Sequence, residues 1–100
     1  MDHLLIFKAL SNEKRQLILQ WLKNPEENFI HQQHDGQFND GVCVGSIQEK
    51  SGLAQSVISS YLDMMQKAGL LESKRIGKWT YYRRNEQVIK ELGEFIKKEL

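Results

Sequence analysis

The sequence of 100 residues predicts one domain of the mainly α (α+β) class, with about five helices and a two-stranded β-hairpin. Three observations lead to this prediction. Residues 46–68 carry two helical patterns separated by a glycine, residues 71–84 form two β-prone arms around another glycine, and residues 86–100 repeat an amphipathic helical stripe. The composition, 40% hydrophobic and 27% charged, is that of an ordinary globular protein.

The first two expected helices cover residues 2–10 and about 13–23. The first is apolar almost all round, so it must bury more than one face, either in its own domain or against a second chain. Asn12 or Ser11 is a suitable N-cap for the second helix. Pro25 is expected to end that helix, because the residue before a proline avoids the helical conformation.

Residues 26–41 show no periodicity and are rich in Asn, Gln and Asp. We expect a loop there, and a connection of about 16 residues exceeds the usual length, which favours a functional or mobile segment. Phe29 and Phe38 are expected to attach this loop to the body of the domain.

Residues 46–68 predict a helix-turn-helix, in which residues 46–51 form a short helix and Gly52 ends it. In the longer second helix, Ile58, Leu62 and Met65 form one apolar stripe. The opposite side holds short hydroxyls and one amide, which suit close approach to base edges. The alternative is a plain solvated helix face. The candidate base-reading residues are Gln55, Ser56, Ser59 and Ser60.

Residues 71–84 predict a β-hairpin with Gly77 and Lys78 at its turn, and next to a helix-turn-helix such a ribbon is a wing. Basic residues on a wing suit phosphate contacts, which position a protein without reading sequence. Arg75 and Lys78 rank first, because a hairpin tip can reach the minor groove or its flanking phosphates. The aromatic residues Trp79, Tyr81 and Tyr82 are expected to pack within the wing. The candidate phosphate contacts are Lys67, Lys74, Arg75, Lys78, Arg83 and Arg84.

The last expected helix covers residues 86–100 and begins at Asn85 or Glu86. Its apolar stripe either packs on the domain's own core or forms part of a dimer interface. We favour dimerisation through residues 2–10 and 86–100, because both helices are more apolar than a monomer of this size needs. The stripe consists of Val88, Ile89, Leu92, Phe95, Ile96 and Leu100.

Charge is distributed unevenly, although the net charge of the chain is only +1. Residues 54–84 hold six basic and two acidic side chains, whereas residues 24–41 hold four acidic side chains and no Lys or Arg. This asymmetry is expected where only one face of a protein meets nucleic acid.

Five blocks of the sequence, taken together, resemble the ArsR/SmtB family of small dimeric winged-helix repressors. The resemblance covers most of the chain and implies a homodimer, formed by the first and last helices, that binds double-stranded DNA at an inverted repeat. Two positions depart from the family pattern: Ala54 stands where Ser usually caps the recognition helix, and Val57 replaces the usual Thr. The blocks are Phe7–Arg15, Val42–Ile47, Leu53–Leu62, Gln66–Leu71 and Arg75–Tyr82.

The metal ligands common in this family are missing. Where many members have Cys-Val-Cys, this chain has Cys43-Val44-Gly45, and its last helix has no His for the family's other zinc site. We therefore expect no cofactor. A weaker alternative is a mixed nitrogen–sulfur zinc site of His31, His34 and Cys43, with Asp35 or Asp40 as a fourth ligand.

Cys43 is also a redox candidate, since a thiol near a helix N-terminus has a lowered pKa. The alternative, which we favour, is that Cys43 has a structural role as a small buried hydrophobic residue between Val42 and Val44.

Other function classes find little support. The sequence contains no Gly-rich phosphate loop and no arrangement of Ser, His and Asp that suggests an enzyme. No apolar run approaches the roughly 18 residues of a membrane span, no signal peptide is visible, and a single cysteine fits a reducing cytoplasm.

We therefore expect a cytoplasmic, sequence-specific DNA-binding transcriptional regulator, a dimeric repressor released by a signal that the sequence does not name. The alternative is a winged-helix module that binds a protein and has little or no specific affinity for DNA. Ala54, the near-neutral net charge and the acidic residues of 24–41 favour this alternative.

Overall fold

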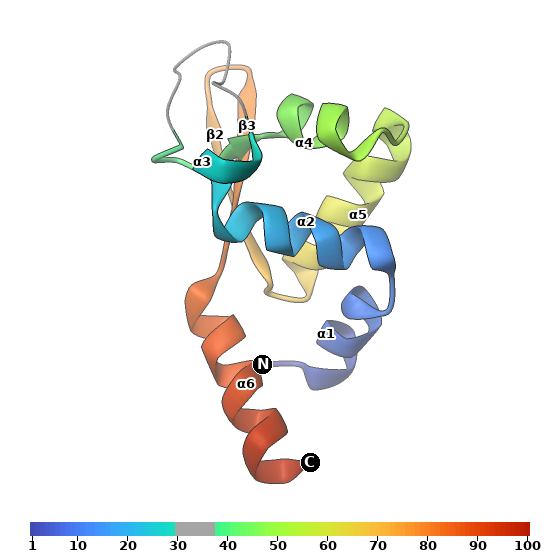
Figure 1. The fold of residues 1–100 in the computed structure, drawn as a ribbon, viewed down its shortest axis with the longest axis vertical. Helices are drawn as coiled ribbons and strands as arrows, with labels where there is room; N and C mark the ends of the chain where they lie inside the picture. Colours follow the sequence, from blue (N-terminus) through green and yellow to red (C-terminus); the bar gives the residue numbers. More distant parts are fainter. Residues whose placement is uncertain (30–37) are drawn as a thin grey trace.

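The computed structural model describes residues 1–29 and 38–100, which form six helices and a three-stranded sheet (Figure 1). This is the mainly α class with a wing that the sequence predicts, with one helix and one strand more than expected. The helices are α1 (His3–Leu10), α2 (Glu13–Lys23), α3 (Pro25–Asn28), α4 (Val44–Ser51), α5 (Gln55–Lys67) and α6 (Glu86–Glu99). The strands are β1 (Val42–Cys43), β2 (Leu71–Ile76) and β3 (Trp79–Arg84).

The sheet is antiparallel, with β3 between β1 and β2. The β2–β3 hairpin has the expected arms, and its register pairs Ile76 with Trp79 across a turn at Gly77, where φ is 60°. The third strand was not predicted. It adds only two residue pairs, Val42 with Tyr82 and Cys43 with Tyr81, which tie the base of the wing to the start of α4.

Side-chain caps fix the beginnings of three helices. Asp2, Asn12 and Asn85 accept hydrogen bonds from the backbone N–H groups of Leu5, Arg15 and Val88. Asn12 is one of the two N-caps that the sequence predicts for α2, and α6 begins at Glu86, one of its two expected starts. Such caps satisfy backbone donors that have no partner inside the helix, and each stabilises the fold by about 1 kcal/mol. Gly52 ends α4 in the left-handed conformation, as expected.

The prediction that residues 26–41 form only a loop is wrong at its start. Helix α2 ends before Pro25, as predicted, but Pro25 is also the first residue of the next helix, α3. Proline suits that position, since its fixed φ is helical and its missing N–H would have no partner there. The amide of Asn28 then donates to the carbonyls of Trp21 and Asn24, which holds α3 against the end of α2.

Phe29 and Phe38 attach the described ends of this segment to the domain, as predicted. Their ring centroids are 6.2 Å apart, and both side chains pack on the main hydrophobic cluster. Gly41 follows with φ of 108°, and a Cβ there would lie 2.5 Å from the carbonyl oxygen of Tyr82. Only glycine therefore lets the chain pass this close to β3 on its way into β1.

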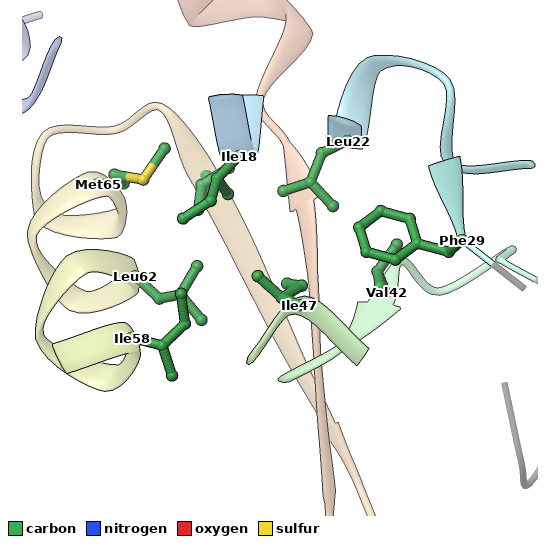
Figure 2. Close-up of a cluster of buried hydrophobic side chains, with 9 residues drawn as sticks. Ile18, Leu22, Phe29, Val42, Ile47, Ile58, Leu62 and Met65 are labelled. Carbon is green, nitrogen blue, oxygen red and sulfur yellow. The ribbon is translucent and has the colours of Figure 1, made fainter. Parts of the chain in front are cut away.

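Two hydrophobic clusters hold the elements together. The larger one joins α2, α4 and α5 to the sheet, and Figure 2 shows Ile58, Leu62 and Met65 pointing from α5 toward Ile18 and Ile47. All five side chains are fully buried, so the predicted apolar stripe of α5 is confirmed. The smaller cluster joins α1 and α6 near the C-terminal end of α5, around residues 6, 9, 68, 70 and 92.

The terminal helices lie together at the end of the molecule opposite the wing (Figure 1). The rings of His3 and Phe95 stack with centroids 3.5 Å apart, which links α1 to α6. Beyond this contact, both helices leave large apolar side chains in solvent. Leu4 is 82% exposed and Leu100 is 80% exposed, with further exposure at Met1, Leu5 and Ile96.

Candidate nucleic-acid interface

The buried side chain of Ser51 stabilises the turn between α4 and α5 with two hydrogen bonds. The Ser51 hydroxyl donates to the carbonyl of Gln48 at 2.8 Å and accepts from the N–H of Leu53 at 3.1 Å. The ammonium of Lys14, from α2, donates to the Ser51 carbonyl at 3.1 Å. These bonds satisfy polar groups at a crowded turn and fix the angle at which α5 leaves α4.

The outer face of α5 presents the polar residues that the sequence singles out. All four candidate base-reading side chains are exposed, whereas Ile58 and Leu62 behind them are fully buried. The helix begins at Ala54, which caps it with extended backbone and no side-chain hydrogen bond, as expected. The face carries no long charged side chain near its start. Its exposed residues are Gln55, Ser56, Ser59 and Ser60.

Two cations stand at the tip of the wing, as predicted. Arg75 bonds through Nε to the carbonyl of Gly77 at 3.2 Å, and the Lys78 ammonium lies 5.3 Å from the centre of the Trp79 ring. Trp79 does not pack inside the wing as expected: it is 38% exposed, and its cross-strand partner Ile76 is 42% exposed. The tip is therefore both basic and apolar.

Three further candidate cations are paired with carboxylates. Lys74 lies 2.9 Å from Asp40, Arg83 lies 3.5 Å from Glu72, and Lys67 lies 2.9 Å from Asp63. All three basic side chains are more than half exposed. Exposed pairs of this kind are worth at most about 1 kcal/mol, so each cation can exchange its carboxylate for a phosphate.

Arg84 is not a surface contact, contrary to the sequence prediction. Its side chain is only 11% exposed and turns toward the body, where Nη1 donates to the carbonyl of Leu19 at 3.4 Å. Nη2 donates to Glu86 at 3.1 Å, and Nε lies 3.0 Å from the other oxygen of that carboxylate, within ion-pair distance but without hydrogen-bond geometry. Arg84 therefore fixes β3 against α2 and α6.

Lys67 is separated from the other candidates. It is the last residue of α5, twelve positions after Gln55, which corresponds to about 18 Å along the helix axis. In Figure 1 the N-terminal end of α5 and the tip of the wing both lie at the end of the molecule away from α1 and α6, whereas Lys67 stands at the opposite end of α5 from Gln55.

The aromatic residues at the base of the wing do pack as expected. Tyr81 is 3% exposed, and Tyr82 is half-buried against the main cluster. Burial raises the pKa of Tyr82 above its ordinary value, and the negative charge of Asp63 raises it further. The Tyr82 phenol therefore stays neutral at physiological pH.

Three residues near the start of α2 were not singled out from the sequence as part of the interface. Lys14 bonds to the helix-turn-helix, while Asn12 and Arg15 contact Tyr61 of α5. No local pattern reveals these contacts, since the partners are 37 to 49 positions apart.

Cys43 is 4% exposed and lies at the junction of β1 and α4, which confirms the interpretation as a small buried residue. Among residues 1–29 and 38–100 there is no cluster of three or more His, Cys, Asp or Glu side chains that could hold a metal ion. His31 and His34 lie outside the described residues, so the alternative zinc site stays a prediction. None of the described helices is long and apolar enough to cross a membrane.

A short helix, a glycine turn, a second helix with a polar outer face and a basic hairpin define the winged helix-turn-helix class. No protein-family model matches the chain. It is 45% identical over its whole length, and the relative's whole length, to the HTH-type transcriptional regulator YbzH of Bacillus subtilis. It is also 29% identical over 77 residues to ArsR2 of Halobacterium salinarum, which is named for an arsenical resistance operon; the match covers 77% of this chain and 54% of that one.

Solved structures agree with these relatives. The homodimeric winged helix-turn-helix DNA-binding domain Mb0332 from Mycobacterium bovis matches with a TM-score of 0.65 and 25% identity, covering 92% of this chain and 72% of that one. NolR from Sinorhizobium fredii matches with a TM-score of 0.62 and 26% identity, covering 93% and 79%. The chain belongs to the ArsR/SmtB family of winged helix-turn-helix transcriptional regulators. Position 45 is glycine and residues 86–100 contain no histidine, so neither of the two ligand sets that the resemblance implies is complete.

Proposed function

We propose that this regulator is a homodimeric, sequence-specific repressor that binds double-stranded DNA at an inverted repeat, with all 100 residues forming one winged-helix domain. The observation that carries the proposal is the outer face of α5, whose exposed amide and hydroxyls can approach base edges without interference from long side chains. The wing beside it supplies Arg75, Lys78 and Arg83 for the phosphate backbone, which fixes register and orientation.

The terminal helices are the proposed dimer interface. Helices α1 and α6 lie together at the end of the molecule opposite the wing (Figure 1), and both carry large exposed apolar side chains, Leu4 and Leu5 on α1 and Ile96 on α6. Covering them with a second copy removes apolar area from water, which is the main driving force of association. The Mycobacterium bovis neighbour is a homodimer, which supports this arrangement. Two recognition helices then enter major grooves about 34 Å apart along the DNA.

Repression follows if the dimer covers a promoter, and the protein then needs neither catalysis nor a resident cofactor. Release requires a signal that binds the DNA-incompetent form better, since a ligand shifts an equilibrium only by differential affinity. The described residues do not name this signal. Zinc, held by His31, His34 and Cys43, and oxidation of Cys43 are the two candidates that the sequence offers, and the cytoplasm is the compartment in which the dimer meets its operator.

The test is selection of duplexes from a randomised library by the purified, reduced, metal-free protein, followed by sequencing. We expect enrichment of an inverted repeat whose half-sites are separated by about one helical turn. The enriched duplex then serves as a probe for release by zinc and by oxidants. Failure to enrich any sequence, both in the metal-free state and with zinc present, would overturn the proposal.

A second candidate function is a winged helix that docks on a protein partner. The exposed Ile76 and Trp79 at the wing tip favour it, because an apolar tip suits a protein surface as well as a groove. The dependence of DNA affinity on salt concentration distinguishes the two functions. A specific DNA complex keeps a margin of affinity above about 0.2 M salt, whereas nonspecific contacts to phosphates are lost for every duplex.

A further inference from the structure

Arg15 is a buried charged residue, 8% exposed. Within residues 1–29 and 38–100, none of the four ion pairs includes it. Burying a charge is unfavourable unless other groups solvate it. The structure supplies two backbone carbonyls and one aromatic ring for this purpose, and these partners come from different helices.

The carbonyls belong to the last turn of α1. Arg15 Nε donates to the carbonyl of Ala9 at 2.7 Å, and Nη2 donates to that of Lys8 at 3.3 Å. The last carbonyls of a helix have no partner within it and form the negative end of its dipole, so a guanidinium stabilises them well. Gln16 adds a bond of 2.6 Å to the carbonyl of Leu10. The start of α2 therefore caps the end of α1.

The ring belongs to Tyr61 in the middle of α5. The Arg15 guanidinium carbon lies 4.8 Å from the ring centroid, within the range of a cation–π contact. The Tyr61 hydroxyl accepts from Asn12 Nδ2 at 3.3 Å, and Asn12 Oδ1 in turn accepts from the N–H of Arg15 at 3.0 Å. Asn12, Arg15 and Tyr61 thus form a closed set of contacts.

This set joins the two helices whose mutual angle matters most for a dimeric regulator. In the function proposed above, α1 meets the partner copy and α5 enters the major groove. Their relative orientation determines the distance between the two recognition helices of the dimer, and that distance must match the spacing of the half-sites. Tyr61 follows Ser60, a candidate base-reading residue. A displacement of Tyr61 would therefore also displace the exposed face of α5 that holds the candidate base-reading side chains.

We propose that Arg15 and Tyr61 are positioning residues for DNA recognition: the guanidinium holds the end of α1 and the Tyr61 ring together, and thereby sets the half-site spacing that the dimer accepts. Neither side chain needs to touch DNA in this role. The inference rests on the proposed function, because spacing has meaning only for a dimer that reads an operator.

The experiment compares Tyr61→Leu and Tyr61→Phe with the wild-type protein on the selected operator. The probes are that operator, versions with the half-sites one base pair closer or further apart, and a random duplex of equal length. Fluorescence anisotropy measures affinity, sedimentation equilibrium measures dimerisation, and thermal melting checks folding. Tyr61→Phe is the matched control, since it keeps the ring and loses only the hydroxyl.

We expect Tyr61→Leu to bind the operator about tenfold more weakly, which corresponds to about 1.4 kcal/mol and lies between an exposed and a desolvated cation–π contact, with little change on the random duplex. The affinities of Tyr61→Leu for the three half-site spacings should become more nearly equal, or a different spacing should bind best. Tyr61→Phe should keep the wild-type order of affinities. A role in stability alone does not change the preferred spacing. If Tyr61→Leu does not fold, Arg15→Lys, which keeps the charge but loses the planar fork, is tested in the same way.

Two results would overturn the inference. The first is an unchanged spacing preference and operator affinity in a folded, dimeric Tyr61→Leu. The second is an equal loss of operator affinity in Tyr61→Phe, which would assign the effect to the hydroxyl and not to the stacked ring. A wild-type protein that prefers no duplex at all contradicts the proposed function itself, and this outcome is visible before any variant is measured.

Discussion

The ammonium of Lys74 lies 2.9 Å from the Oδ1 oxygen of Asp40. This ion pair connects the wing to the acidic stretch that precedes β1, so a carboxylate is paired with a cation that the sequence predicts as a candidate phosphate contact. Asp40 is held in place by the turn that ends at Gly41, whose N–H donates to the carbonyl of Phe38 at 3.1 Å. We therefore expect the pair to oppose DNA binding by a small but measurable amount.

Replacing Asp40 with Asn should strengthen DNA binding. The variant leaves Lys74 available and removes a negative charge from the DNA-facing side, and an exposed pair corresponds to about a two- to fivefold gain in affinity. Titration of the operator at low and high salt measures the gain, which should shrink as salt screens the charge. Asp63→Asn, which breaks the Lys67 pair at the distant end of α5, is the control and should change affinity less. Equal affinities of Asp40→Asn and wild type at low salt would contradict the prediction.

Gln55→Ala and Lys78→Ala should weaken binding in different ways. Gln55 faces outward at the start of α5, so its loss should relax the preference at one base position, by about 1–3 kcal/mol. Lys78 stands at the wing tip, and its loss should weaken all duplexes alike and reduce the dependence on salt. Affinity measured on a panel of single-base operator variants distinguishes the two. A uniform loss in both variants would remove Gln55 from the base-reading set.

Ala54→Ser should stabilise the folded protein. Ala54 has the extended backbone of an N-cap, with φ of −63° and ψ of 151°, but offers no side-chain acceptor to the first N–H groups of α5. A serine supplies one, and the expected gain in the free energy of unfolding is about 1 kcal/mol. Urea denaturation measures it. Asn85→Ala is the matched control, since it removes an existing cap of α6 and should produce a loss of similar size. No gain in Ala54→Ser beside a clear loss in Asn85→Ala would show that the start of α5 is already satisfied.

Charges placed on the terminal helices should separate the dimer. Leu4→Glu and Leu100→Glu introduce carboxylates at side chains that are 82% and 80% exposed, so the monomer should still fold while the covered interface becomes unfavourable. Sedimentation velocity should show monomers, with loss of operator binding. Ile76→Glu, at the exposed wing tip, should remain dimeric. Dimers of unchanged stability in Leu4→Glu and Leu100→Glu would place the interface elsewhere.

Stability should fall at high pH partly because of Tyr82. Burial, with the charge of Asp63, raises the pKa of this phenol in the folded state. The folded protein then holds the proton more tightly than the unfolded chain, whose tyrosines titrate near pH 10, so the free energy of unfolding declines as pH rises beyond about 10. Tyr82→Phe should show a shallower decline in urea denaturation between about pH 9 and pH 11. Identical slopes for the two proteins would exclude the contribution.

Most of the helix-turn-helix and the wing could be predicted because their signals are local. The spacing of Ile58, Leu62 and Met65 identifies the buried face of α5, and the glycine between two β-prone arms places the hairpin turn. The N-cap at Asn12 and the start of α6 next to Asn85 depend on the following few residues only, so they are visible in the sequence as well.

What the sequence could not reveal depends on contacts between distant residues. Strand β1 is two residues long and exists only because β3, almost forty positions later, pairs with it. Arg84 has the composition of a surface cation, but the carbonyl of Leu19, 65 positions away, turns it inward. Trp79 differs in the opposite direction: an aromatic residue in a strand usually packs, but at the tip of the hairpin this side chain stays 38% exposed. The site assignments on α5 and the wing remain predictions until DNA binding is measured.

The anchoring of Phe29 and Phe38 on the main cluster has a consequence for how this chain can change over time. Both rings pack on the cluster that also holds the buried face of α5, so the chain leaves α3 and approaches β1 at fixed points of the core. Substitutions at positions 29 and 38 are therefore expected to stay within large hydrophobic side chains, because a smaller side chain would leave a cavity in the cluster that supports the recognition helix.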